Sequence, residues 1–456
     1  MAFWESGLVF DALIVAALLF VAATLRKIIP PMRALGVPNS MVAGFIGLVC
    51  GPTALALLPF DPETLASFVY HGLALVFIAV SLQSPAKGKG GGGATSVAFA
   101  IPFLAVLQGL VGLLAVLAFS AFAVEKMHPG MGLMLPLGFN QGPGQALSLG
   151  RSWEASGFAS GGEIGLIVAS MGFAWAVFIG VPLVAWGRKK GWAADPGSGA
   201  ESTEVDQVER VVPPPGAGAL ELLSTQAVWI GLVYLATYGI LYGLASLLAD
   251  KPQFAAMVWG FHFIIGTFLA LGARRLLDRL VPRHQLEDRL LGRISGTTVD
   301  VITCSAIAAV SLTVFRANLV PILVLTSLGG LATLLSCIWL ARRAFPSAPF
   351  QHAVVMFGAA TGTLPTGLAL LRIMDPEMKG PVPANVVLGA AGALVLSIPL
   401  LIVVLPIPIA GFEHDYWGSI WLAVGILCVY IGLLLVGWRL LGPLRFARPW
   451  RRFWPD

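Results

Sequence analysis

The chain has 456 residues, of which 57% are hydrophobic and 11% charged. Its mean hydropathy of +0.86 and its recurring apolar runs of about 20 residues exclude a soluble globular domain and indicate an all-α polytopic membrane protein. The net charge of +5 does not indicate nucleic-acid binding, because the basic residues lie in short loops beside apolar segments, where they set orientation. We therefore expect a lipid bilayer around the chain and no nucleic-acid partner.

Long apolar segments fill the first half of the chain, residues 1–186, around one interrupted stretch at 128–155. The first segment follows acidic residues and has no small-residue cleavage site, so we expect a membrane span there and not a cleaved signal peptide. The predicted spans of this half are Leu8–Leu25, Ser40–Leu58, Ala66–Leu82, Ser96–Val124 and Glu163–Trp186.

A polar, Gly- and Pro-rich stretch at 187–222 is predicted to be a flexible cytoplasmic linker. The second half, 223–411, again surrounds one interrupted stretch, at 352–375. Residues 412–456 add one further span and a basic cytoplasmic tail. The predicted spans after the linker are Gln226–Leu248, Phe254–Leu271, Val299–Val314, Leu319–Leu340, Val386–Ile409 and Ile420–Leu440.

The two interrupted stretches resemble each other. Asn140 to Arg151 reads NQGPGQALSLGR and Thr361 to Arg372 reads TGTLPTGLALLR, and the two arginines are 221 positions apart (372 − 151). At membrane depth a backbone rich in Gly and Pro is tolerated only where protein or a water-filled cavity surrounds it. Interruptions at matching places in two halves predict a pair of re-entrant hairpins that form a transporter's binding site.

The distribution of basic residues predicts the orientation of the chain. If the amino terminus is outside and each hairpin returns to the side from which it came, only four of the 28 Lys and Arg residues lie outside: Lys126, Arg151, Lys251 and Arg316. The carboxyl terminus is then cytoplasmic. The matching sequences IAVSL, at Ile78–Leu82, and AAVSL, at Ala308–Leu312, support the correspondence of the halves. We predict two repeats of inverted topology, with about 11 transmembrane helices plus two re-entrant hairpins, suited to alternating access.

The stretch Ala273 to Arg293 combines dense charge with leucines at every third or fourth position. This pattern predicts an amphipathic helix pair at the cytoplasmic interface, broken at Pro282. A surface arm that joins two rigid bodies is the favoured interpretation, with a regulatory role as the alternative.

Helix amino termini at a hairpin tip present unpaired N–H groups and partial positive charge, which favour an anionic group such as a carboxylate. Unwound carbonyls, hydroxyls and amides offer the hard oxygen ligands that sodium prefers. The predicted substrate-binding residues are Asn140, Gln141, Gly142, Pro143, Gly144, Gln145, Thr361, Gly362, Thr363, Pro365, Thr366, Gly367, Gln108 and Arg372, and the sodium candidates are Gln141, Thr361, Thr363, Ser81, Ser311 and Asp300.

Several of these assignments have structural alternatives. Each hairpin arginine is followed three positions later by an acid, Glu154 or Asp375, so a salt bridge within one helical turn competes with substrate binding. Asp300 begins an apolar span, where ion coordination and interfacial capping are both possible. Gln108 is the one polar amide in a long apolar segment and either bonds between helices or lines the substrate path.

These motifs resemble the bacterial sodium/glutamate symporter family over nearly the whole chain. The family pattern G-x-x-x-G-x-x-P-T-[AG]-x-A stands at Gly358 to Ala369, its glycine-rich first tip at Gln141 to Ala146, and its V-P-x-x-x-V-A-G stretch at Val37 to Gly44, while Gln108 matches a family glutamine. The first tip lacks the family's usual His and Thr. The resemblance implies an elevator-type transporter, a homodimer, that couples sodium entry to glutamate uptake in the bacterial inner membrane.

We therefore predict a sodium-coupled symporter that imports a small anionic solute, with glutamate or a related amino acid or carboxylate favoured and no cofactor beyond the coupling ion. Proton coupling is one alternative, and an ion channel, from a different functional class, is another. No enzyme is expected, because neither an HExxH nor a GxSxG motif occurs. The four cysteines stand singly in or beside apolar runs and indicate buried thiols.

Overall fold

The computed structural model describes residues 7–29, 37–84, 91–122, 126–192, 219–281, 286–376, 378 and 380–445. Within these ranges the chain is helical and contains no strand. The helices of the first half are α1 (Gly7–Ile28), α3 (Asn39–Cys50), α4 (Pro62–Ser81), α5 (Gly92–Phe122), α6 (Pro129–Pro136), the π-helix η1 (Leu137–Gln141), α7 (Pro143–Glu154), α8 (Gly161–Phe178) and α9 (Gly180–Lys189).

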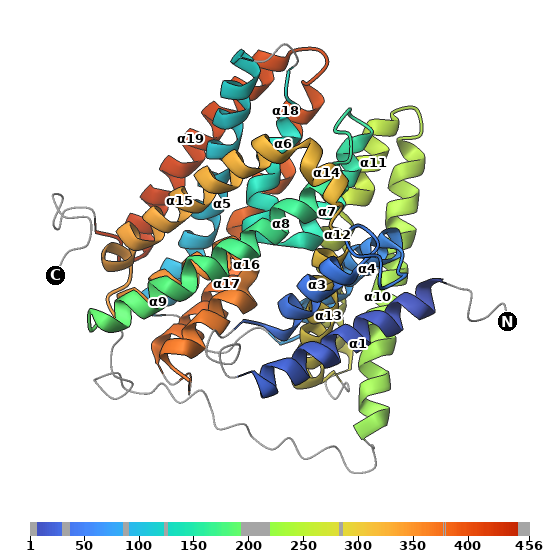
Figure 1. Cartoon of the computed structure of the whole chain (residues 1–456), viewed down its shortest axis with the longest axis horizontal. Helices are drawn as coiled ribbons and strands as arrows, with labels where there is room; N and C mark the ends of the chain where they lie inside the picture. The colour runs from blue at the N-terminus through green and yellow to red at the C-terminus, as the bar shows by residue number, and fades with distance from the viewer. Residues whose placement is uncertain are drawn as a thin grey trace.

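The described residues of the second half also form a set of packed helices (Figure 1). Its helices are α10 (Ala219–Leu247), α11 (Pro252–Gly260), α12 (His262–Leu280), α13 (Asp288–Ala308), α14 (Leu312–Ala317), α15 (Leu319–Ala344), α16 (Pro349–Met374), α17 (Pro381–Pro399), η2 (Leu400–Val404), α18 (Pro406–Ala410) and α19 (Tyr416–Leu441).

Nine helices in the described part of the chain are long and apolar enough to cross a membrane, or ten if α11 and α12, which are bent by 53°, form one span. Many of their large apolar side chains are exposed, as helices that face lipid require. The prediction of an all-α, multi-pass membrane protein is thus confirmed.

The predicted span Ser40–Leu58 is too long. Helix α3 ends at Cys50 because Gly51 and Pro52 follow, and the residue before a proline disfavours the helical conformation. Its 12 residues are about 18 Å long, well short of the bilayer's apolar core of about 30 Å. Glycines instead bring α3 against α13: a methyl group added at Gly47 would lie 2.8 Å from Ala308 Cβ.

The helices form two groups, seen on opposite sides of Figure 1. Bundle A contains α1, α3, α4 and α10 to α13, with α4 packed along α13 and α12. Bundle B contains α5 to α9 and α15 to α19, with α5 packed along α17 and α19. Each half of the chain contributes its first helices to bundle A and its later ones, including its interrupted stretch, to bundle B.

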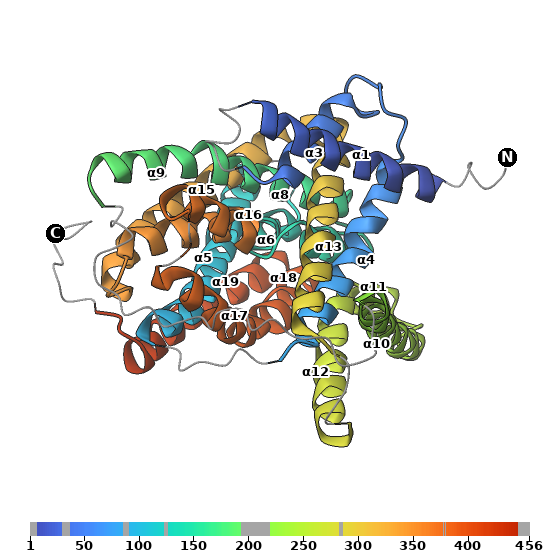
Figure 2. The same ribbon diagram turned by 90° about the horizontal axis from the view of Figure 1, so that it is seen from below.

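The stretch Ala273–Arg293 is helical on both sides of a break, as predicted, but its two parts are not a separate helix pair. Helix α12 continues without interruption to Leu280, and α13 begins at Asp288, so this stretch lengthens two long helices; Pro282 lies outside the described residues. The charged end of α12 remains helical because leucine and arginine are good helix formers and Arg274 pairs with Asp278 one turn further on. Figure 2 shows α12 projecting beyond the rest of the bundle.

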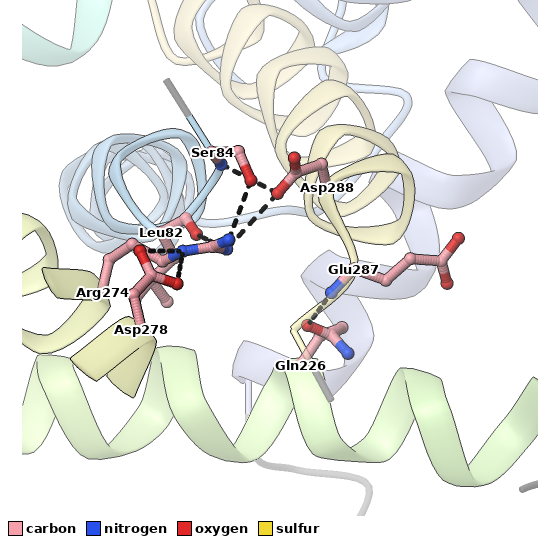
Figure 3. A network of polar contacts seen from close by, with 7 residues as sticks. All are labelled: Leu82, Ser84, Gln226, Arg274, Asp278, Glu287 and Asp288. Atoms are coloured by element: carbon pink, nitrogen blue, oxygen red, sulfur yellow. Dashed lines mark hydrogen bonds and ion pairs between the residues drawn. The ribbon is translucent and has the colours of Figure 1, made fainter. Parts of the chain in front are cut away.

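A polar network around Arg274 of α12 holds the carboxyl end of α4 (Figure 3). The Arg274 guanidinium donates to the backbone oxygen of Leu82 at 2.9 Å and to Ser84 Oγ at 2.8 Å, and it pairs with Asp278 at 3.0 Å. Asp288 Oδ1 accepts from the Ser84 backbone N–H at 2.9 Å. The last carbonyl groups of a helix lack intrahelical donors, so this arginine satisfies α4 at the point where the chain leaves bundle A.

Two regions with predicted roles lie mostly outside the described residues. Of the predicted linker 187–222, residues 193–218 are not described, and of the basic tail, 446–456 are not. The further span of 412–456 corresponds to α19.

Candidate functional site

The first interrupted stretch forms a helical hairpin from α6, η1 and α7. Gly142 breaks the helix with φ = 100° and ψ = 175°, and Pro143 begins α7. The two ends of the hairpin lie together: His128 Nε2 is 3.2 Å from the backbone oxygen of Ser156, and its ring stacks on Phe158 at 4.9 Å. A Gly-Pro pair explains the break, since glycine accepts positive φ and proline suits the first helical position.

The second interrupted stretch, α16, also folds back on itself. Its backbone leaves the helical conformation at Gly362 (φ = −145°, ψ = 27°) and Thr363 (φ = 70°, ψ = 164°). A methyl group added at Gly358 would lie 2.8 Å from Gly367 Cα. In a straight helix residues nine positions apart are separated by about 13 Å, so the two arms pack side by side. The length of α16 therefore does not make it a single straight span.

The two hairpin tips touch each other. A methyl group added at Gly142 would lie 2.6 Å from Thr363 Cγ2. These two residues are again 221 positions apart (363 − 142), and both combine positive φ with extended ψ. Because Thr363 is not a glycine, its conformation is strained by roughly 1–3 kcal/mol, and such strain tends to occur at functional sites.

Helix α8 packs against both tips. A methyl group added at Gly172 would lie 2.2 Å from the backbone oxygen of Thr361 and 2.8 Å from Phe139 Cδ1. One at Gly138 would lie 2.8 Å from the Ala169 backbone nitrogen. Small residues let these backbones approach closely, as is usual between helices in membranes.

Gln108 on α5 caps the first arm of α16. Its Nε2 donates to the backbone oxygen of Ala360 at 2.7 Å and to Thr333 Oγ1 at 2.9 Å. The break at Gly362 and Thr363 removes the helical donor that this carbonyl would otherwise have, so the amide replaces it. Gln108 is fully buried. Of the two predicted roles for Gln108, the bond between helices is the one that the structure shows.

The other predicted substrate-binding residues differ in exposure. Asn140, Gln141 and Thr363 are half-buried and Pro365 is exposed, so the tips reach an accessible surface. The remaining residues of the two tips are buried: Gly142, Pro143, Gly144, Gln145, Thr361, Gly362, Thr366 and Gly367. Asn140 Nδ2 donates to the backbone oxygen of Ile101 at 3.2 Å.

Arg372 and Arg151 do not lie at the tips. Each follows its break, at Thr363 or Gly142, by nine residues, which is about 13 Å along a helix. Arg372 is exposed. Arg151 pairs with Glu63 of α4, with Nη2 2.6 Å from Oε1, and the predicted pair with Glu154 does not form.

The acids that follow the two arginines bond backbone groups instead. Glu154 accepts from the Gly162 N–H at 3.0 Å, and Asp375 accepts from the Gly380 N–H at 2.9 Å. Among the described residues neither arginine pairs with the acid three positions on. Chain spacing predicted the pairs, but nearby unpaired N–H groups compete for the carboxylates.

Three of the sodium candidates lie at the tips and three do not. Gln141 and Thr363 are half-buried there, while the Thr361 hydroxyl is already bonded to Phe357 O at 2.7 Å. Elsewhere, Ser81 ends α4, and Ser311 caps α14 by accepting from the Val314 N–H at 3.3 Å.

The third candidate away from the tips, Asp300, does not begin its helix. It lies 12 residues inside α13 and is exposed, because α13 starts at Asp288. Within the described ranges no group of three or more His, Cys, Asp or Glu residues could hold a metal ion.

The side chains of His262 and Ser148, which were not predicted from the sequence as site residues, connect bundle A to the first hairpin. His262, at the bend between α11 and α12, places Nε2 2.9 Å from the Tyr70 backbone oxygen and Nδ1 3.3 Å from Ser148 Oγ. Ser148 also donates to Gly260 O at 2.9 Å. In the sequence, His262 is a histidine within an apolar segment, and this pattern is compatible with any core position.

Comparison with protein-family models and with curated proteins finds no match to this chain. The resemblance to sodium/glutamate symporters therefore rests on the quoted motifs alone.

Proposed function

We propose that the protein is a secondary transporter that imports a small carboxylate-bearing solute together with sodium by alternating access. The observation that carries this proposal is the meeting of Gly142 and Thr363, the break points of two hairpins from different halves of a multi-pass membrane protein. Interrupted helices at corresponding positions of two halves are the best sequence pointer to a transporter's binding site.

The tips offer suitable chemistry for both ligands. Two helix starts lie at the tips: the first turn of α7, and the start of the second arm of α16 at Pro365. The N–H groups of a first turn have no intrahelical acceptors, so they favour a carboxylate. Carbonyl groups freed by the breaks, with the side-chain oxygens of Gln141 and Thr363, suit sodium. The residues Gln141 and Thr363 are half-buried, so both are partly accessible.

The arrangement of the bundles supports movement of one bundle against the other. Both hairpins belong to bundle B, and both halves distribute their helices between the bundles in the same order. We extend the proposal to two inverted repeats, 1–186 and 223–411, that work as an elevator in the bacterial inner membrane. In this proposal the amino terminus is outside, the carboxyl terminus is cytoplasmic and the protein is a homodimer.

Uptake into proteoliposomes tests the proposal. We expect saturable accumulation of a carboxylate solute that requires an inward sodium gradient and stops when the gradient is collapsed. Uptake driven by a proton gradient without sodium would favour the proton-coupled alternative. A current that rises with driving force without saturating would favour a channel.

Thr366→Val is the matched probe for the site, because it keeps the shape of a buried tip residue and removes its hydroxyl. We expect it to lower uptake at least about tenfold. Thr237→Val is the control, since Thr237 is also buried but lies on α10 and bonds its own helix at Val233 O. Gly144→Val is less suitable, because even a methyl group there would lie 2.8 Å from Leu73 Cδ1.

A further inference from the structure

The helices that surround the two tips carry very few charges. Helices α3, α5 and α6 and η1 contain no charged residue, α8 has only Glu163 in its first turn, and the arginines of α15 lie in its last turn. After Arg293, the one charged residue of α13 is the exposed acid Asp300. Among the described residues, arginines come close to the tips in sequence only on α7 and α16.

Neither of those arginines reaches a tip. Arg151 and Arg372 lie about 13 Å along the helix from Gly142 and Thr363, which is farther than an arginine side chain extends. Arg151 is also held by Glu63, with 2.6 Å between Nη2 and Oε1. A ligand at the tips is therefore not in contact with the arginine of either hairpin.

Apart from the proposed coupling ion, the positive charge at the tips comes from two helix starts. Each helix start is equivalent to roughly +0.5 elementary charge, so the two together balance about one negative charge. Burying a second carboxylate without a cationic side chain is strongly unfavourable. Arginine is the usual partner for such a group, since it binds carboxylates in bidentate geometry.

A buried acceptor lies beside these N–H groups. Gln145, in the first turn of α7, is 1% exposed, and its Oε1 has no hydrogen-bond partner in the described part of the chain. An unpaired buried oxygen is unfavourable, so a ligand that donates a hydrogen bond here is favoured. An ammonium, amide or hydroxyl group has that property.

We propose that the transported solute has a single carboxylate together with a neutral hydrogen-bond donor or an ammonium group. Neutral amino acids and hydroxymonocarboxylates belong to this class, and dicarboxylates such as glutamate do not. This inference rests on the proposed transport function, and it narrows the solute from the glutamate that the family resemblance implies.

Matched solute pairs test the inference on the wild-type protein. Glutamine and glutamate have nearly the same shape, and malate is lactate with one more carboxylate on its methyl group. In thermal-shift titrations and in competition for uptake, both at one fixed sodium concentration, the single-carboxylate member of at least one pair should have an apparent Kd at least about tenfold lower. Both members of a pair are measured at the same sodium concentration, so the comparison isolates the effect of the second carboxylate.

The outcomes separate this inference from the proposed function. If glutamate or malate is transported with sodium as well as its partner or better, the transport function stands and the inference is wrong. If no solute gives sodium-dependent uptake, both fail.

A charge-supplying variant gives a second test. Gln145→Lys places a cation in the first turn of α7, and Gln145→Met supplies a similar length without charge. In protein that retains a cooperative melting transition, the lysine variant should shift the preference toward glutamate at least about tenfold and the methionine variant should not. An unchanged preference in the folded lysine variant would show that missing positive charge does not exclude the second carboxylate.

Discussion

Thr363 and Gly142 show how single residues define the two tips. Both adopt positive φ, but only Gly142 does so without strain, and Thr363 Cγ2 occupies the space beside it. Thr363 is half-buried, and its proposed role as a sodium ligand is one that a glycine side chain could not supply. The strain, the tip contact and the proposed sodium ligand thus coincide at one residue.

Gly142→Ala tests the tip contact. The added methyl group meets Thr363 Cγ2 and adopts an unfavourable φ, so we expect destabilisation by about 1–3 kcal/mol, measured by thermal unfolding in detergent. Adding Thr363→Gly removes the clash but not the strain at position 142, so the double variant should recover part of the loss. If the two changes are simply additive, the tips do not touch.

Gln108→Leu tests the amide cap on the first arm of α16. The substitution leaves the Ala360 carbonyl and the Thr333 hydroxyl without their donor in a buried place, so we expect a loss of about 1–3 kcal/mol in unfolding free energy. Thr333→Val combined with Gln108→Leu should cost less than the sum of the single changes, because both remove the same hydrogen bond. An unchanged melting temperature in Gln108→Leu would contradict this role.

At the scale of elements, helix ends are where tertiary contacts matter most. Helix α4 ends in a network formed by α12 and α13, while the first arm of α16 ends against α5. In both cases a side chain from a different helix supplies the donor that the last carbonyl groups lack. The interruptions are therefore stable only within the assembled bundle.

Arg274→Ala should weaken the anchorage of α4. It removes the donors to Leu82 O and Ser84 Oγ and the ion pairs with Asp278 and Asp288, so we expect the protein to lose about 1–3 kcal/mol of stability. Arg275→Ala is the control, since it removes the same charge from the adjacent, exposed position. Equal melting temperatures for the two variants would indicate that the network adds no stability.

At the scale of the whole molecule, the first hairpin connects the two bundles. Arm α7 of bundle B lies against α11 and α4 of bundle A, with the Arg151–Glu63 pair and the Ser148–His262 contact across the boundary. Movement of bundle B against bundle A, as the proposed mechanism requires, must break these contacts. Both contacts are weak enough to break: an exposed ion pair such as Arg151–Glu63 contributes about 0–1 kcal/mol, and a neutral hydrogen bond about 0.5–1.5 kcal/mol.

A disulfide across the boundary tests this movement. A methyl group added at Gly260 would lie 2.9 Å from Ser152 Cβ, so cysteines at these positions can bond after a small adjustment. With Cys50 and Cys428 replaced by serine, oxidation of Gly260→Cys/Ser152→Cys should abolish uptake and a reductant should restore it. Gly47→Cys/Ala308→Cys, with a similar 2.8 Å separation inside bundle A, is the control and should keep uptake. Full uptake by the oxidised Gly260/Ser152 pair would exclude separation of α7 from α11.

Composition and local sequence determined much of this protein without any structure. Long apolar runs fix helices in a membrane, since only paired backbones are stable in lipid, and the Gly-Pro stretches near Gly142 and Gly362 fix where those helices break. These are properties of a few adjacent residues. The same kind of reasoning failed at α3, whose predicted span was too long, because helix ends depend also on what packs beside them.

Only the tertiary structure decided which distant groups meet. Three contacts join residues that sequence spacing cannot relate. Gly142 contacts Thr363, Arg151 pairs with Glu63 and not with Glu154, and Gln108 donates to the backbone oxygen of Ala360. Hydrophobic periodicity says which face of a helix is buried but not against which helix. Such pairings follow from the close packing of the whole bundle, where each donor bonds the acceptor that the fold brings to it.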